Sequence, residues 1–449
     1  DNPASDPGIY DLVIHGGTIV TVNPDADVID NGWIGICGNR LQRIGNRLAG
    51  DRVPQARRTI NAEGHLVLPG LVNTHTHLPM TVFRGLADDQ PLDQWLHRHI
   101  FPAEAAHMTP ENVALGSLLG CIEMIRSGTT TCCDGYFLEA HVAEAAAAAG
   151  IRAVLGQGVV DFPAPGVPDP AQNIAAAVAF IEGWQQRSSK IIPSIFCHSP
   201  YTCSEKTLKK AKRAASENNV LFQIHLAETR AEKESIQRDH HCSPVEYLQR
   251  LDLLDPQTLL VHCVWLANQD PGLLAQSNAA VSHNPDSNAK LGCGIAPLSD
   301  LLAAGVRVGI GSDGCASNNT LDLFRTMDFA AKLHKVATGD PTAAAAETVL
   351  RMATIEGARA LGLDGEIGSL EAGKKADLVL LDCNRPHLVP MYRPASHLVY
   401  AARGGDVATV IIDGEIVYEQ GRITTVDTAD VLARARRAGE KIRHWSASQ

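Results

Sequence analysis

Two histidines separated by a single residue end an apolar run that begins at Leu71. The pair is His75 and His77. In a β-strand, side chains at positions i and i+2 leave the same face, so both imidazoles could bind one metal ion. Two polar side chains that merely sit at a strand end would have the same spacing. The pair alone leaves both alternatives open, and the rest of the chain must separate them.

Ionisable side chains also end most of the other apolar runs. They are His198, His225 with Glu228, His262, His283 and Asp313. A single histidine at such a position is usually a packing residue, but six of eight predicted strands end in this way. Burying so many ionisable groups together is costly unless a metal or a substrate satisfies them. The convergence therefore favours a shared functional site.

The elements that would bring these side chains together form a repeated α/β pattern. Short apolar runs predict strands at residues 67–75, 129–134, 152–160, 191–198, 221–228, 259–262, 279–283 and 306–313. Helical patterns lie between them, for example at 110–127, 140–149, 204–218, 244–251, 269–277 and 295–304. Eight such units predict a (β/α)8 TIM-type barrel with its chemistry at the carboxyl ends of the strands. A doubly wound open sheet is the alternative, although no glycine-rich dinucleotide fingerprint follows any strand.

The two flanks of the barrel have a different texture. Short β-segments separated by Gly, Asn and Asp are predicted at 11–15, 17–21, 33–36 and 40–44, and again at 376–382 and 407–417. Neither flank has enough strands to close a core alone, so we expect them to form one small β-sandwich together. The predicted domains are residues 1–62 (first part of the sandwich), 63–367 (barrel) and 368–449 (second part, with a C-terminal helix).

Composition limits the classes of partner. The 39 Lys and Arg against 50 Asp and Glu give a net charge of −11, and the charges are scattered. This balance argues against nucleic acid or an anionic membrane as partner and leaves a small-molecule substrate. No apolar run reaches the length of a membrane span. The 11 cysteines lack paired metal-binding spacing, which predicts a reduced, cytoplasmic protein.

Seven segments carry specific motifs in a fixed order. They are 69–80 (PGLVNTHTHLPM), 84–89 (RGLADD), 101–104 (FPAE), 125–131 (IRSGTTT), 225–229 (HLAET), 281–291 (VSHNPDSNAKL) and 311–319 (GSDGCASNN). This set resembles the amidohydrolase superfamily of metal-dependent hydrolases. Within it the chain is most similar to the methylthioadenosine/S-adenosylhomocysteine deaminase group and its deoxyadenosine-deaminating relatives. The similarity extends into the second flank at 368–380 and implies a homodimer or a larger homo-oligomer.

The resemblance implies a metal site and a reaction. His75, His77, His225 and Asp313 would hold one divalent metal, which we expect to be zinc, with Fe²⁺ or Mn²⁺ as alternatives. Binuclear members of the superfamily use a bridging lysine or glutamate, and the predicted strand 191–198 contains neither, so a mononuclear site is expected.

The catalytic residues would be Asp313, His262 and Glu228. Asp313 would hold the attacking water and accept its proton, while His262 would orient it or polarise the developing oxyanion. Glu228 would carry protons to a ring nitrogen and then to the departing amino group.

The same resemblance implies substrate contacts. Glu104 matches a position that binds ribose hydroxyls, and a carboxylate can accept hydrogen bonds from two of them. A helix N-terminal acid is the structural alternative. His198 matches a substrate-contacting position, and Trp95 would supply an apolar or stacking wall unless it is a buried structural residue.

Two departures from the family pattern bear on the choice of substrate. Gln157 stands where relatives that accept S-adenosylhomocysteine have an arginine, and the loop 162–170 has no basic residue. A neutral amide cannot replace a guanidinium–carboxylate pair. We therefore expect 5′-methylthioadenosine, 5′-deoxyadenosine or adenosine to be preferred over S-adenosylhomocysteine. Gly135 stands where the resemblance leads us to expect a larger apolar residue, and it would enlarge the pocket.

Two other functions stay open at this point. The same metal chemistry could act on guanine, a pterin or an s-triazine, with ammonia, an amine or chloride as leaving group. Alternatively, the barrel could be a non-catalytic binding module. The presence of Glu228 and His262 argues against this last alternative, because a binding module has no need for residues that activate water.

Overall fold

Eight parallel strands form the centre of the molecule. The structure is a computed structural model that describes residues 8–47 and 52–446. The strands are β6 (Leu71–Thr76), β7 (Thr129–Tyr136), β8 (Arg152–Val159), β9 (Ile191–Cys197), β10 (Phe222–Leu226), β11 (Thr258–His262), β12 (Ala280–His283) and β13 (Arg307–Ile310). They pair in sequence order, and the backbone N–H of Asp313, just after β13, donates to the carbonyl of His75 in β6 at 3.0 Å. This contact brings the last strand back to the first, so the predicted barrel is confirmed.

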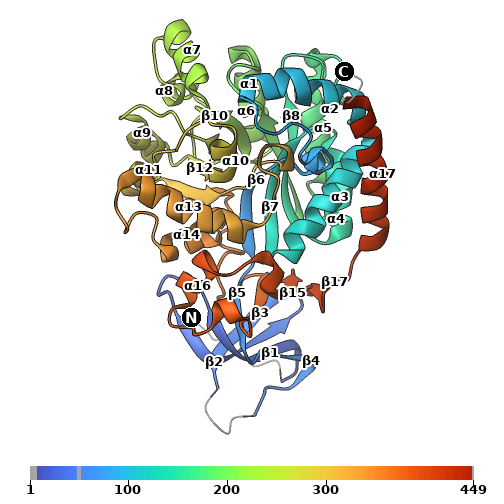
Figure 1. The fold of residues 1–449 in the computed structure, drawn as a ribbon, viewed down its shortest axis with the longest axis vertical. Helices are drawn as coiled ribbons and strands as arrows, with labels where there is room; N and C mark the ends of the chain where they lie inside the picture. Colours follow the sequence, from blue (N-terminus) through green and yellow to red (C-terminus); the bar gives the residue numbers. More distant parts are fainter. Residues whose placement is uncertain (1–7, 48–51, 447–449) are drawn as a thin grey trace.

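Helices surround this barrel (Figure 1). They are α1 (Leu92–Gln94), α2 (Phe101–His107), α3 (Pro110–Arg126), α4 (Glu139–Ala149), α5 (Asn173–Trp184), α6 (Glu205–Glu217), α7 (Arg230–His240), α8 (Pro244–Arg250), α9 (Asp270–Ser277), α10 (Pro285–Lys290), α11 (Leu298–Ala303), α12 (Cys315–Asn318), α13 (Leu323–Thr338), α14 (Ala346–Met352) and α15 (Ile355–Ala360). Because helices cover the barrel from outside and side chains fill it from inside, every residue of β7 and β8 is buried. Capping residues mark helix starts: Ser243 and Glu246 form a capping box at α8.

The two flanks join in one nine-stranded mixed sheet below the barrel (Figure 1). Its strands are β1 (Tyr10–Val20), β2 (Val28–Cys37), β3 (Arg40–Asn46), β4 (Ala56–Asn61), β5 (His65–Pro69), β14 (Leu378–Asp382), β15 (Val407–Ile412), β16 (Glu415–Glu419) and β17 (Arg422–Ile423). Strand β14 pairs antiparallel with β5, and side chains of both flanks share one apolar core. The prediction that the flanks pack together is confirmed.

Four predicted segments differ from the structure in detail. Segments 11–15 and 17–21 form the single strand β1, which is irregular around Gly17. Segment 407–417 is two strands joined by a turn at Asp413 and Gly414. Segment 67–75 is divided between β5 in the flanking sheet and β6 in the barrel. Apolar runs alone do not reveal where a strand changes sheets.

A buried ion pair joins the two sheets. The guanidinium of Arg152, at the start of β8, donates to the carboxylate of Asp377 at 2.8 Å and 3.1 Å. The same guanidinium also reaches Asp413 at 3.3 Å. The last helix, α17 (Thr428–Ser446), runs along the side of the barrel and packs against α3 (Figure 1).

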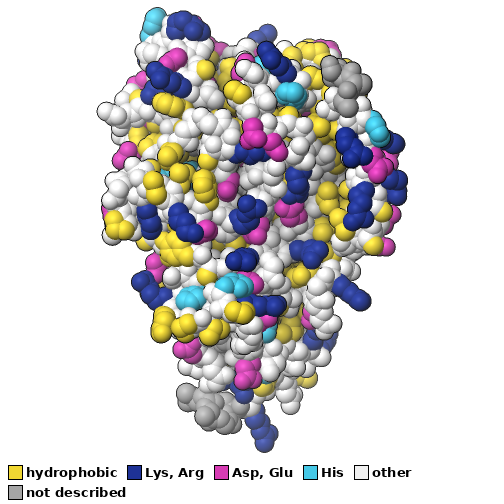
Figure 2. Space-filling view, in the orientation of Figure 1, with side chains coloured by type: hydrophobic (Ala, Val, Ile, Leu, Met, Phe, Trp, Pro, Cys, Tyr) yellow, Lys and Arg dark blue, Asp and Glu magenta, His cyan; other side chains and the backbone are white. Residues whose placement is uncertain are grey.

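The surface carries charges of both signs. Lys and Arg side chains are interspersed with Asp and Glu on the face drawn in Figure 2. Over residues 8–47 and 52–446, no helix is both long and apolar enough to cross a membrane.

Candidate active site

The carboxyl ends of three barrel strands bring together the residues that the sequence singles out as metal ligands. His75 lies in β6 and His77 directly follows it, His225 lies near the end of β10, and Asp313 follows β13. The Oδ1 atom of Asp313 lies 3.5 Å from His75 Nε2 and 3.3 Å from His77 Nε2, and the Nε2 atoms of His75 and His225 are 3.2 Å apart. We call these four residues the donor cluster.

The chemistry of the donor cluster fits a divalent cation. Burial lowers the pKa of His77 to about 4 and that of His225 well below its usual value, so both imidazoles are neutral at pH 7. Burial alone would raise the pKa of Asp313, but the hydrogen bond from His75 and the positive charge that the histidines carry when protonated at low pH hold it well below its usual value. Two neutral ring nitrogens that face each other beside a carboxylate are satisfied by a bound cation.

The geometry also gives His262 a place beside this cluster. The ligand atoms of His75, His77 and Asp313 lie within 4.8 Å of one another, and so do those of His75, His225 and His262. All of these atoms belong to buried or nearly buried side chains.

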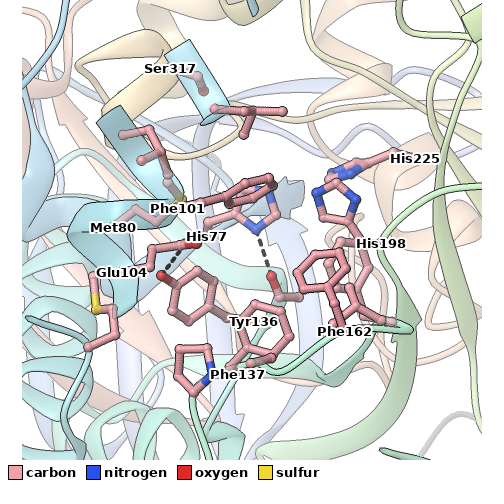
Figure 3. Close-up of a pocket in the computed structure, with 18 of the residues that line it drawn as sticks. His77, Met80, Phe101, Glu104, Tyr136, Phe137, Phe162, His198, His225 and Ser317 are labelled. Atoms are coloured by element: carbon pink, nitrogen blue, oxygen red, sulfur yellow. Dashed lines mark hydrogen bonds between the residues drawn. The ribbon is translucent and has the colours of Figure 1, made fainter. Parts of the chain in front are cut away.

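Hydrogen bonds fix the orientation of the donor cluster. His77 donates from Nδ1 to the carbonyl of Gly135 at 2.6 Å, a bond drawn as a dashed line from His77 in Figure 3. Its Nε2 atom therefore faces Asp313. The Oδ2 atom of Asp313 accepts from the hydroxyls of Ser287 at 2.6 Å and Ser317 at 2.9 Å. Sequence reasoning missed both serines, although they lie inside the motifs at 281–291 and 311–319. Partners of this kind set the geometry and basicity of metal ligands.

Glu228 and His262 lie together at the edge of the cluster. Glu228 Oε1 is 3.7 Å from His262 Nε2, and the amide of Asn288 is 2.9 Å from His262 Nδ1. Burial, and then the negative charge of Asp313, raises the pKa of Glu228 well above its usual value, which favours the protonated form of this carboxyl. Burial lowers the pKa of His262 to about 3. The pair thus sets a neutral imidazole beside a carboxyl that is poised to carry a proton.

A second carboxylate, Glu232 at the start of α7, holds the backbone that carries Glu228. Its two oxygens accept from the backbone N–H groups of Ala227 at 2.8 Å and Glu228 at 3.0 Å. Ala227 has a φ of 52°, a left-handed conformation that an alanine adopts at a cost. Glu232 was not predicted, although its position four residues after Glu228 was a usable signal.

A cavity of about 540 Å³ opens from the donor cluster. Its walls are mostly apolar and aromatic, and among the described residues that line it there is no Lys or Arg. The aromatic walls come from Trp95, Phe101, Tyr136, Phe137, Phe162 and Phe196. We call this space the substrate cavity. Its size and its few polar groups are typical of a small-molecule site.

Three of the four predicted substrate residues line this cavity. Glu104 in α2 accepts a hydrogen bond of 2.5 Å from the hydroxyl of Tyr136 (Figure 3), and burial raises its pKa to about 7. Tyr136 was not predicted. His198 follows β9, with Nδ1 3.1 Å from the hydroxyl of Thr202. Trp95 is also in the cavity wall.

The structure does not bring Gln157 to the cavity. Its side-chain oxygen accepts from the backbone N–H of Glu139 at 3.1 Å, at the start of α4. Side chains alternate between the faces of a strand, and this one points outward to the helix layer. Gln157 therefore gives no information on which substrate binds. The observation that bears on the choice of substrate is that no described residue of the cavity wall is a Lys or an Arg.

Gly135 lines the substrate cavity, and its effect on the size of the pocket stays a prediction. A β-carbon added at Gly135 would lie 2.5 Å from Cγ of Phe196, so that ring occupies the space that a larger residue would take.

Comparisons with known proteins identify the family of this chain. A profile described as the amidohydrolase family matches residues 66–417. A 5-methylthioadenosine/S-adenosylhomocysteine deaminase of Syntrophobacter fumaroxidans is 48% identical over 435 residues, 96% of this chain and 98% of the relative. A 5′-deoxyadenosine deaminase of Methanosarcina acetivorans is 42% identical over 433 residues, with 96% and 98% covered. The crystal structure of an adenosine deaminase from Xanthomonas campestris with bound zinc superposes with a TM-score of 0.94 at 36% identity, covering 98% of this chain and 100% of that one.

Proposed function

Because the chain belongs to the amidohydrolase family, we propose that it hydrolyses the amino group of an adenine nucleoside, giving the inosine analogue and ammonia. The observation that carries this proposal is the position of Glu228. A buried carboxyl with a raised pKa lies 3.7 Å from His262 and faces the substrate cavity beside the donor cluster. A binding module has no need for a proton donor there, whereas a deaminase needs one to release ammonia.

The residues divide the work of the reaction. The four residues of the donor cluster would hold a divalent cation, which when bound would lower the pKa of a water molecule toward neutrality and so supply a nucleophile. Asp313 accepts a proton from the attacking water as its oxygen bonds to the carbon that bears the amino group. His262 polarises that oxygen, and Glu228 protonates the adjacent ring nitrogen. Glu228 then takes the proton of the added hydroxyl and passes it to the amino group, which leaves as ammonia as the carbon–nitrogen bond breaks and the oxygen becomes a carbonyl. The proton accepted by Asp313 returns Glu228 to its acid form for the next turnover.

We assign one divalent ion to each chain, and zinc in preference to Fe²⁺ or Mn²⁺. Three imidazoles and one carboxylate are typical zinc donors, and β9 offers neither a lysine nor a glutamate as a bridging ligand. Elemental analysis of protein purified without chelator should give about one zinc per chain, while two ions per chain would contradict the assignment. A homodimer or larger assembly, a cytoplasmic location and the domain boundaries at 62/63 and 367/368 stay predictions from the sequence.

The substrate cavity supports an adenine nucleoside with an uncharged 5′-substituent. Glu104 keeps one carboxylate oxygen beyond the one bound by Tyr136, and that oxygen suits a ribose hydroxyl. The walls near Phe101 and Phe162 are apolar, and no described lining residue carries a positive charge that would pair with the amino-acid carboxylate of S-adenosylhomocysteine. We therefore rank 5′-methylthioadenosine, 5′-deoxyadenosine and adenosine above S-adenosylhomocysteine.

One screen tests both parts of the proposal. Ammonia release is measured for these four nucleosides, for free adenine and guanine, for a pterin and for an amino-s-triazine. We expect turnover of the three uncharged nucleosides and a kcat/KM for S-adenosylhomocysteine at least about tenfold lower, the loss of one charge-assisted contact. Turnover confined to guanine, pterin or triazine would replace the nucleoside by another heterocycle. Equal kcat/KM for S-adenosylhomocysteine and 5′-methylthioadenosine would contradict the ranking.

A further inference from the structure

Phe196 in β9 sits in a notch that two glycines on neighbouring strands leave open. A β-carbon at Gly135 in β7 would lie 2.5 Å from Cγ and 2.8 Å from Cδ1 and Cδ2 of Phe196. A β-carbon at Gly156 in β8 would lie 2.8 Å from Cβ of Phe196. Neither glycine is among those with a positive φ. Glycine is therefore needed at both positions because it has no side chain, and not because of its backbone freedom.

The ring of Phe196 lies beside the donor cluster in the wall of the substrate cavity. Its centroid lies 5.0 Å from that of His225, 5.8 Å from that of His77 and 6.4 Å from that of His198. Phe196 lines the cavity although it is only 3% exposed. A planar ring bound at the donor cluster would therefore lie close to it.

We propose that Phe196 is a specificity-determining residue whose ring forms a wall of the subsite for the substrate's base. Gly135 is the seat of this ring, by which we mean the position whose missing side chain leaves room for it. The inference rests on the proposed function and adds to it the shape of the base that the enzyme accepts. An aromatic wall packs well against a flat heteroaromatic base. It also excludes a base that carries an extra group on the edge facing the wall.

The first test replaces Phe196 and varies the base. F196A and the milder F196L are assayed with adenosine and with adenosines methylated at C2 or at C8. We expect F196A to lower kcat/KM for adenosine about tenfold, mainly through KM, and to raise kcat/KM for at least one methylated base about tenfold relative to adenosine. F196L should show the same changes to a smaller extent.

Unchanged relative kcat/KM for both methylated substrates would overturn the inference, because a purely structural phenylalanine would change all three substrates alike. Wild-type turnover of adenosine tests the proposed function separately. If the wild type released no ammonia from any adenine nucleoside, the proposed function would fail, and the notch would still be tested by the glycine variants.

The second test uses the two glycines as a matched pair. All three atoms closest to a β-carbon at Gly135 belong to the Phe196 ring, whereas the one at Gly156 would also meet Nε2 of Gln223 at 2.9 Å and the backbone nitrogen of residue 196 at 3.2 Å. G135A should lower the thermal midpoint and, where the enzyme is active, lower kcat/KM about tenfold in the wild-type background and less than about twofold in F196A. G156A should damage both backgrounds. Equal damage by G135A in both would overturn the assignment of Gly135 as the seat.

Discussion

The donor cluster and the substrate cavity are neighbours, but the chain builds them in different ways. All four donor residues lie at or within a few residues of barrel strand ends, and backbone contacts such as that between His77 and Gly135 hold them. The cavity walls come from α2, from the loop around Phe162 and from strand side chains such as Tyr136 and Phe196. The barrel therefore fixes where chemistry occurs, while connections and packing decide which molecule reaches it.

The largest expected effect comes from breaking the donor cluster. H225A removes one imidazole, and we expect kcat to fall on the order of 10⁴-fold or more, because the attacking water loses the cation that lowers its pKa. Zinc content, measured by elemental analysis, should fall with activity. Treating the wild type with a chelator should give the same loss, reversed by added zinc. Full activity in metal-free protein would refute the cation's role.

The next effect separates proton transfer from metal binding. E228Q keeps the size of the side chain but cannot deliver a proton, so kcat should fall about 10²- to 10⁴-fold. Zinc content should stay close to the wild-type value, because Glu228 is not in the donor cluster. E234Q is a control on the exposed side of α7, where Glu234 pairs only with Arg230 among the contacts of the structure, and should be fully active. A kcat within about twofold of wild type in E228Q would remove Glu228 from the mechanism.

The contrast also explains what the sequence could predict. The sequence pattern placed His75, His77, His225 and Asp313 at one site because the strand ends of a barrel converge, and the family resemblance then assigned them as metal ligands. Gln157 was misplaced because a motif position does not reveal which face of β8 a side chain takes. The contact between Phe196 and Gly135 could not be predicted from the sequence, because it joins β9 to β7 across β8. Such a contact exists only once three strands have paired.

A smaller expected effect tests Glu104, the residue of the substrate cavity that we propose binds the ribose. E104Q should raise KM for nucleosides and lower their kcat/KM about 10- to 100-fold, because a charge-assisted hydrogen bond to a ribose hydroxyl is weakened. Any slow activity on free adenine should be unchanged, since the free base lacks the ribose. The measurement is kcat/KM for adenosine and adenine side by side. Equal losses on both would mean that Glu104 shapes the cavity rather than binding the sugar.

The smallest expected effect is on the stability of E104Q. This substitution should lower activity, but it should raise the thermal midpoint relative to the wild type as the pH rises. Burial raises the pKa of Glu104 from 4.5 to about 7, so the folded chain binds this proton more tightly than the unfolded chain does. This contribution is fully present below pH 4.5 and is lost as the pH rises toward 7. In E104Q the loss is absent, while the amide can still accept from Tyr136. The thermal midpoint of E104Q minus that of wild type should therefore increase from pH 5 to pH 8. A difference that is constant with pH would mean that Glu104 is ionised in the folded protein throughout this range. The buried negative charge would then not lower the free energy of unfolding.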